Sequence, residues 1–343
     1  MHMADALLSP AVGGTLWIAT AGTIAYCGKK VQAGLDDRKI PLMGVLGAFI
    51  FAAQMINFTI PGTGSSGHLG GGMILAILLG PHAAFLTIAS VLTVQALFFA
   101  DGGLLALGCN IFNLGVFPCF IAYSLIYKPI AGTRHTPFRI GLGASLAAII
   151  GLQLGALGVV FETVVSGVSA LPLSAFLSVM LPIHLAIGLV EGLVTTAVVT
   201  FIWRARPEIL ELAATARPLG RLPIGKVVGA IAAAAVVVGG GLSWFASSSP
   251  DGLEWSMAKI SGKEELEGPE QGIHQSLADL QEKIAFLPDY GFKGKAPEPA
   301  GEEQTAWPAV DGGTTTSGLV GGVLTLVITL LCGLLLKKRR RAA

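Results

Sequence analysis

Apolar residues fill the chain in nine stretches that are separated by short polar or glycine-rich turns. A helix that rises 1.5 Å per residue needs about 20 residues to cross a hydrocarbon core of ~30 Å, and most of the stretches reach that length. The pattern predicts an all-α integral membrane protein with a half-helix at 69–80 and full spans at 11–28, 40–58, 82–100, 104–127, 140–165, 173–203, 225–246 and 318–336.

Composition supports a membrane protein and excludes several other classes. Hydrophobic residues make up 53% of the chain and charged residues 13%, against about 25% charged in soluble domains. A soluble enzyme is therefore excluded. The net charge is +1 and no basic surface is expected, so nucleic acid is not a partner. The four cysteines lie in apolar stretches without C-x-x-C spacing, which indicates buried hydrophobic residues rather than disulfides.

The positions of the basic residues predict the orientation, because cytoplasmic loops are enriched in Lys and Arg. Of the 22 basic residues, 17 follow the first, fifth, seventh and last spans, and the loops at 59–67, 101–103 and 166–172 have none. This arrangement places the N-terminus outside and the C-terminus in the cytoplasm of a cell-membrane protein, provided that the chain turns at Gly80-Pro81. Proline ends helices, which favours that break.

The order of the spans and the positions of the basic residues between them predict two modules. Residues 1–224 form a seven-span domain that ends in a basic connector at 204–224, and residues 225–343 form a two-helix hairpin around a small extracytoplasmic segment at 247–317. That segment has 13 acidic residues against five lysines, a net charge of −8. Its middle, about 259–283, is expected to form one amphipathic helix; a flexible acidic loop is the alternative.

The first residues contain a potential metal chelate. They lack the basic region and cleavage site of a signal peptide, so the mature chain is expected to begin at Met1. The Met1 amine, the peptide nitrogen of His2 and the Nδ1 atom of His2 would close a five-membered and a six-membered ring around one ion. Planar nitrogen ligation favours Ni²⁺ or Cu²⁺.

His68 is the candidate for a fourth nitrogen. It ends the glycine-rich loop 61–72 and begins the half-helix, on the same outer side as the N-terminus. Irregular backbone at membrane depth is tolerated where it is buried in protein or lines a cavity. We therefore predict a metal site formed by Met1, His2 and His68.

Other polar residues within the spans offer an alternative. Glu162, His184 and Glu191 could form an ion path in a self-contained secondary transporter, since ionisable groups in a bilayer are functional candidates. They could equally be polar groups satisfied by neighbouring helices. Asp101 is expected to cap the next helix. The segment 220–226 has the spacing of a phosphate loop, but Val227 replaces the required Ser or Thr, so no ATPase is expected in this chain.

Several segments together resemble the CbiM/NikM family, the substrate-binding components of energy-coupling-factor transporters for nickel and cobalt. The resemblance is carried by Met1-His2 with 5–10, by 51–58, 64–69, 96–103, Gly108 and Asn110, and by His184-Leu185 with 188–195. Residues 249–255, Ser-Pro-Asp-Gly-Leu-Glu-Trp, resemble the opening of the PDGLE domain found in the accessory subunits CbiN and NikN.

The resemblance implies a transport component and no enzyme or catalytic cofactor. Ni²⁺, or alternatively Co²⁺, would be the bound substrate, held by the Met1 amine, the nitrogens of His2, and His68. A transmembrane coupling subunit and two cytoplasmic ATPases would be the partners, and the PDGLE segment would assist metal loading, with its acidic charge attracting cations. An extracytoplasmic metal sensor is the remaining alternative.

Overall fold

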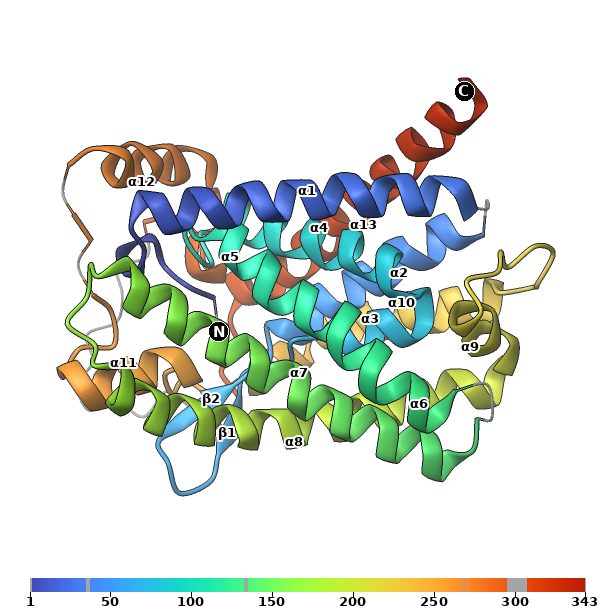
Figure 1. Ribbon diagram of the computed structural model, residues 1–343, viewed down its shortest axis with the longest axis horizontal. Coiled ribbons are helices and arrows are strands. Elements are labelled where there is room, and N and C mark those ends of the chain that lie inside the picture. The colour runs from blue at the N-terminus through green and yellow to red at the C-terminus, as the bar shows by residue number, and fades with distance from the viewer. Residues whose placement is uncertain are drawn as a thin grey trace.

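The computed structural model describes residues 2–34, 38–132, 135–266, 268–269, 271–294 and 307–342. These residues form a helical bundle whose long helices run roughly along the longest axis of the molecule (Figure 1). The long helices are α1 (Pro10–Gly34), α2 (Lys39–Gln54), α4 (Pro81–Phe99), α7 (Pro137–Ser166), α8 (Leu173–Ala205), α10 (Gly225–Gly240) and α13 (Gly312–Ala342). Another long helix runs without interruption through α5 (Leu107–Ile111), the π-helical η2 (Phe112–Tyr127) and α6 (Lys128–Ala131).

Shorter elements lie between and at the ends of the long helices. A two-stranded antiparallel sheet pairs β1 (Phe58–Ile60) with β2 (Ser65–Gly67), with Thr59 opposite Ser66. The short helices are η1 (Asp5–Leu7), α3 (Gly72–Leu79), α9 (Pro207–Ala214), η3 (Leu242–Phe245), α11 (Gly252–Ser261), α12 (Ile273–Ile284) and η4 (Pro288–Tyr290).

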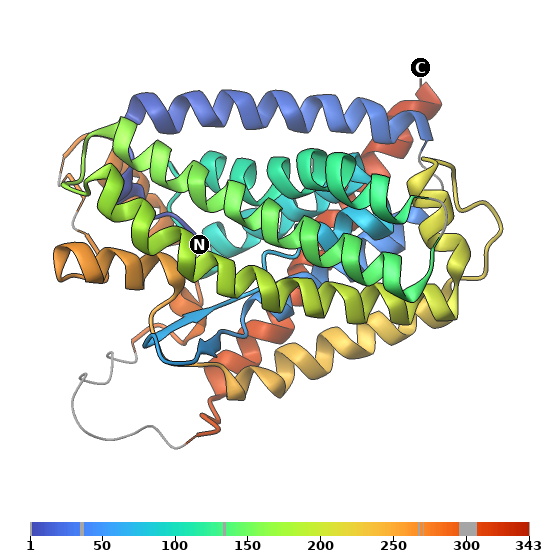
Figure 2. The ribbon, with the colours of Figure 1, turned by 60° about the horizontal axis from the view of Figure 1, so that its bottom comes forward.

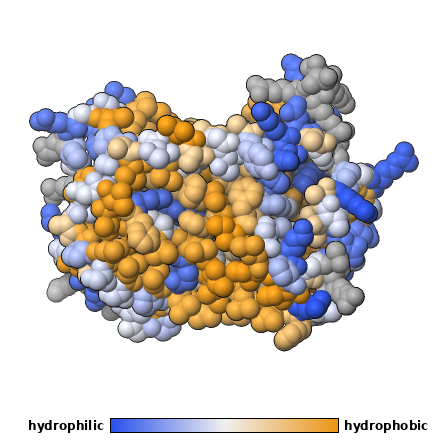
Figure 3. Space-filling view, in the orientation of Figure 1, coloured by the Kyte–Doolittle hydropathy of each residue, from blue (hydrophilic) through white to orange (hydrophobic). Residues whose placement is uncertain are grey.

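The face of the molecule drawn in Figure 3 carries an apolar belt of the kind a bilayer requires. Figure 3 shows hydrophobic residues across the middle of the molecule and hydrophilic residues toward its two ends. Within the described part of the chain, five helices are long and apolar enough to span a membrane: α4, 107–131, α7, α8 and α13. Helices α2 and α10 are apolar but have 16 residues each. The predicted all-α membrane protein is confirmed.

The half-helix predicted at 69–80 is present as α3. All eight of its residues are buried, as expected of a helix that is apolar on every side. It ends at Gly80 (φ 78°), and Pro81 begins α4, so the predicted break is confirmed. Helix α3 contacts α9, and a side-chain carbon added at Gly80 would lie 3.4 Å from the carbonyl oxygen of Ala213, so the half-helix ends against α9.

The hairpin formed by α10 and α13 is part of the bundle. Both helices pack against α2 and against each other, and α13 also contacts α1 and α4 (Figure 2). The expectation of a single amphipathic helix over 259–283 is wrong. Two helices, α11 and α12, are present instead. Gly262 (φ 76°) ends α11 and Gly272 (φ 78°) precedes α12. Both glycines adopt left-handed backbone conformations, which end or interrupt helices.

Candidate metal centre

The N-terminal segment enters the bundle instead of extending from it. Figure 1 shows the N-terminus among the helices. Met3 is fully buried and is held at both backbone groups by Asn110: its N–H donates to Asn110 Oδ1 (2.8 Å), and its carbonyl accepts from Asn110 Nδ2 (3.2 Å). Asp5 accepts a hydrogen bond from the N–H of Ala106 (2.9 Å). These bonds fix His2 beside the end of α4.

The loop that carries His68 is anchored from inside the bundle. The two carboxylate oxygens of Glu191, on α8, accept hydrogen bonds from the N–H groups of Gly70 and Gly71, at 3.0 Å each. Gln54, on α2, donates to the carbonyl of Gly70 (2.9 Å). Gly71 adopts φ 75°, and a side chain there would lie 2.6 Å from Ile50. The loop therefore approaches α2 so closely that only glycine fits.

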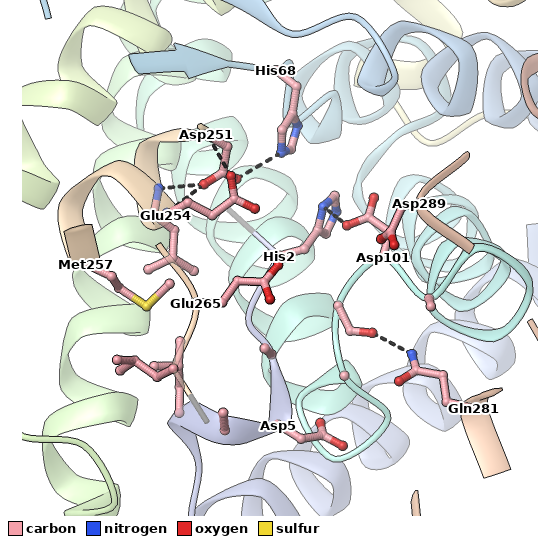
Figure 4. A pocket seen from close by; sticks show the side chains of 18 of the residues that line it. His2, Asp5, His68, Asp101, Asp251, Glu254, Met257, Glu265, Gln281 and Asp289 are labelled. Atoms are coloured by element: carbon pink, nitrogen blue, oxygen red, sulfur yellow. Dashed lines mark hydrogen bonds and ion pairs between the residues drawn. The ribbon is translucent and has the colours of Figure 1, made fainter. Parts of the chain in front are cut away.

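His2 and His68 lie next to each other at the pocket drawn in Figure 4. Their rings are stacked, with centroids 4.9 Å apart and planes 5° from parallel. His2 Nδ1 lies 3.0 Å from Asp101 Oδ1, and His68 Nε2 lies 3.9 Å from Asp251 Oδ2. Burial lowers the pKa of His68 to about 3. The imidazole is therefore neutral at physiological pH, which is the form that binds metals.

A cavity of about 490 Å³ opens beside the two histidines and is lined by carboxylates. Burial opposes ionisation of Asp101, but the charge and hydrogen bond of His2 lower the pKa of this carboxyl well below its usual range. Such carboxylates attract cations into a confined space. The acidic residues that line the cavity are Asp5, Asp101, Asp251, Glu254, Glu265 and Asp289.

Two of the three predicted ligands can be placed. His2 and His68 are brought together, whereas Met1 lies outside the described residues. Within the described part of the chain, no three His, Cys, Asp or Glu side chains are arranged to hold a metal. Side chains alone therefore do not form a complete site, and any metal held here needs further donors. Backbone nitrogens can supply them.

The predicted role of Asp101 as a helix cap is wrong. Its carboxylate contacts His2 and accepts a hydrogen bond from the hydroxyl of Tyr290. Asp5 instead accepts from the N–H of Ala106, one residue before α5. The sequence favoured Asp101 because it lies just ahead of the helix, but the N-terminal segment, distant in sequence, occupies that position.

The alternative ion path is not assembled as one set of groups. Glu162 accepts a hydrogen bond from Asn113 Nδ2 (2.8 Å), and His184 Nδ1 contacts the carbonyl of Met180 (2.8 Å). Glu191 holds the loop backbone as described above. The three side chains are engaged by separate neighbours. The interpretation of satisfied polar groups holds only in part, because His184 Nε2 is buried without a hydrogen-bond partner among the described residues.

Two residues of the site were not expected from the sequence. Asp251 belongs to the PDGLE opening, which was noted for its resemblance and not as part of the site, and it faces His68. Tyr290 contacts Asp101. The residue pattern Pro-Asp-Gly-Leu-Glu was the available signal for Asp251. Nothing in the local sequence around Tyr290 indicated its contact.

Fold and cavity together define a multi-pass membrane protein with a histidine- and carboxylate-lined cavity at one end of its helices. The family model of CbiM, described as a cobalt uptake substrate-specific transmembrane region, matches residues 2–209, and the PDGLE domain model matches residues 225–338. The chain therefore belongs to the CbiM family and carries a PDGLE domain behind its CbiM region.

Individual relatives agree with this assignment. A fused nickel transport protein, NikMN, of Rhodobacter capsulatus is 31% identical over 310 residues, which cover 84% of this chain and 88% of the relative. A cobalt transport protein, CbiM, of Geobacter sulfurreducens is 30% identical over 153 residues, 44% of this chain and 42% of the relative. A crystal structure of a truncated transition metal transporter is similar, with a TM-score of 0.54, 29% identity, and coverage of 60% of this chain and 99% of that one.

Proposed function

We propose that this chain is the substrate-binding component of an energy-coupling-factor importer that captures Ni²⁺ outside the cell and delivers it to the cytoplasm. Family membership supports a role in metal transport. Support for nickel comes from the R. capsulatus relative, which is named a nickel transport protein and has the same fused arrangement. Co²⁺ is the alternative substrate, because the G. sulfurreducens relative is named a cobalt transport protein.

Four nitrogens would bind the metal: the Met1 amine, the peptide nitrogen and Nδ1 of His2, and an imidazole nitrogen of His68. The observation that carries this proposal is the stacking of His2 on His68, which joins the N-terminus to the glycine loop. Such a planar nitrogen set favours Ni²⁺ over Zn²⁺, Mg²⁺ or Ca²⁺. The chelate requires His2 Nδ1 to turn toward its own backbone and leave Asp101, and it requires a mature chain that begins at Met1.

Transport would require partner subunits. The chain lacks a complete phosphate loop, because Val227 stands where Ser or Thr would hold magnesium. A transmembrane coupling subunit and two cytoplasmic ATPases would therefore supply the energy. The distribution of basic residues supports an extracytoplasmic N-terminus and a cytoplasmic C-terminus. The two matched regions support a division into a metal-binding module at 1–224 and a hairpin module at 225–343.

The test is a metal titration of two purified full-length proteins, the native chain and a copy that carries Ser-Gly ahead of Met1. The extension changes the position of the amine without altering any side chain. We expect the native chain to bind one equivalent of Ni²⁺ tightly and the extended chain to lose that binding, with Co²⁺ titrated in parallel.

Two histidine variants complete the test. His68→Ala is expected to abolish tight binding. His135→Ala, in the connection before α7 at the opposite end of the bundle, is expected to bind as the native chain does. Equal binding by the native and extended chains would refute the amine as a ligand, and retained binding in His68→Ala would refute the four-nitrogen site.

A further inference from the structure

A groove of about 570 Å³ lies where α13 contacts α1 and α4. The α4 residues that line it are buried or half-buried, whereas α1 and α13 contribute exposed ones such as Ala25 and Cys332. Helix α4 therefore forms the floor of the groove, and α1 and α13 form its walls. The CbiM region supplies α1 and α4 and the PDGLE region supplies α13, so the groove lies at the junction of the two modules.

The groove extends over part of one side of the membrane only. It is lined by residues of α1 between positions 24 and 32 and by residues of α13 between positions 328 and 336. Eight residues of helix rise about 12 Å, which is shorter than the ~15 Å of one leaflet of the hydrocarbon core. Both stretches lie toward the C-terminal ends of their helices, which Figure 1 shows at the same end of the molecule. The basic residues place that end on the cytoplasmic side.

The floor and walls of the groove suit a hydrocarbon chain. The hydroxyl groups of Ser90 and Thr93 donate to carbonyls one turn earlier in α4, at 2.9 and 2.7 Å. These hydroxyl donors are therefore already paired and do not favour a polar ligand. Apart from Lys29 and Gln32, the remaining lining residues are hydrophobic or glycine.

Lys29 adds a positive charge at the cytoplasmic end of the groove. Its side chain is exposed, whereas the neighbouring Lys30 lies over the ring of Tyr26, 5.6 Å from the ring centroid. Lys337 and Lys338 follow in the last turns of α13, at the same end of the molecule (Figure 1). Basic pockets between transmembrane helices on the cytoplasmic side bind the anionic headgroups of lipids.

We propose that this groove binds an anionic phospholipid of the cytoplasmic leaflet, with an acyl chain between α1 and α13 and the headgroup phosphate at Lys29. A hydrophobic groove with one positively charged end is complementary to a molecule with an apolar tail and an anionic head. The lipid contacts both modules and so stabilises their junction within the membrane. The metal centre lies beyond the other end of α4, so lipid binding is expected whether or not the chain binds Ni²⁺.

Native mass spectrometry of the full-length chain tests the headgroup contact, with phosphatidylglycerol and phosphatidylcholine that carry the same acyl chains as probes. We expect the native chain to bind one phosphatidylglycerol in preference to phosphatidylcholine. Lys29→Gln removes the charge and should weaken phosphatidylglycerol binding about fivefold, the effect of one lysine near a membrane surface. Lys226→Gln, exposed at the start of α10 and outside the groove, is the matched control and should bind as the native chain does.

Cys332 reports whether the groove itself is occupied, because it lines the groove and is exposed while the other three cysteines are buried. Phosphatidylglycerol should slow the reaction of Cys332 with a maleimide more than phosphatidylcholine does at the same concentration. Ala25→Leu, which fills the groove from α1, should remove this difference between the two lipids. Ala19→Leu, exposed on the same helix and outside the groove, should keep it.

Three results would overturn the lipid site. The first is equal binding of the two lipids by the native chain, or native phosphatidylglycerol binding in Lys29→Gln. The second is lipid-dependent protection of Cys332 that persists in Ala25→Leu, which would place the lipid outside the groove. The third is protection of Cys332 by a co-purified membrane protein but not by phosphatidylglycerol, which would assign the groove to a helix of another protein.

Discussion

Glu191 is a carboxylate on a helix that crosses the apolar belt, and both of its oxygens are used by the loop backbone. In Glu191→Gln, one oxygen is replaced by an NH₂ group, which cannot accept from a glycine N–H. We expect the free energy of unfolding to fall by about 1–3 kcal/mol, the cost of a buried donor left without a partner. The Ni²⁺ stoichiometry should remain one, because Glu191 is not a ligand.

Thermal unfolding of the purified protein, with Ni²⁺ titration alongside, measures both effects. Glu211→Gln, an exposed position on α9, is the matched control and should change stability by less than about 0.5 kcal/mol. Native stability in Glu191→Gln would contradict the anchoring role. Complete loss of metal binding by a folded Glu191→Gln protein would instead favour the ion path through Glu162, His184 and Glu191.

At this scale the sequence indicated the candidate ligands better than the residues around them. His2 was identified because its nitrogens and the Met1 amine can form a chelate. His68 was identified because it ends a glycine-rich loop on the same predicted outer side. The partners of Asp101 could not be predicted, since Tyr290 and His2 reach it from segments far apart in the chain. Such contacts depend on tertiary packing, which leaves no periodic signal in a single sequence.

Among the elements, α11 shows how the PDGLE residues connect the two modules. A side chain at Gly252 would lie 3.0 Å from both His184 Cε1 and Ile187 Cδ1, so α11 begins in close contact with α8. Gly252→Val should separate the two helices and lower stability by about 1–3 kcal/mol, the usual cost of an overpacked contact. Faster amide exchange is expected in β2, because Ser66 bonds to Pro250.

Hydrogen–deuterium exchange of the native chain and Gly252→Val measures this prediction. The control is Gly229→Val, on α10, where nothing lies within 4 Å of the added carbon, and β2 should exchange as in the native chain. Unchanged exchange in β2 of Gly252→Val would show that the PDGLE residues do not hold the strand.

The elements themselves were predicted to different extents. The long apolar helices and the break at Gly80-Pro81 could be predicted from the sequence, because membrane helices must be continuous and proline interrupts them. Two short helices in place of one over 259–283 were not predicted. Amphipathic periodicity continues on both sides of the interruption, and the left-handed conformations of Gly262 and Gly272 break a helix that periodicity alone would extend.

On the scale of the whole molecule, the basic residues and the carboxylate-lined cavity lie at opposite ends of the apolar belt. The cavity holds His2, His68 and six carboxylates at one end. At the other end, Arg38 donates to the carbonyl of Leu222 and so joins the loop before α2 to the basic connector at 204–224. Positive charge favours the cytoplasmic side, so the cavity is expected to face the outside, where it can accept metal.

Cysteine labelling in intact cells tests this orientation. With the exposed Cys332 changed to Ala, the remaining Cys27, Cys109 and Cys119 are buried and should not react. We expect Gln275→Cys, exposed on α12, to be labelled by a membrane-impermeant maleimide in intact cells. Arg217→Cys, exposed in the basic connector, should be labelled only after the membrane is opened. The reverse pattern would place the cavity in the cytoplasm, and uptake from outside would then be refuted even if Ni²⁺ binding were intact.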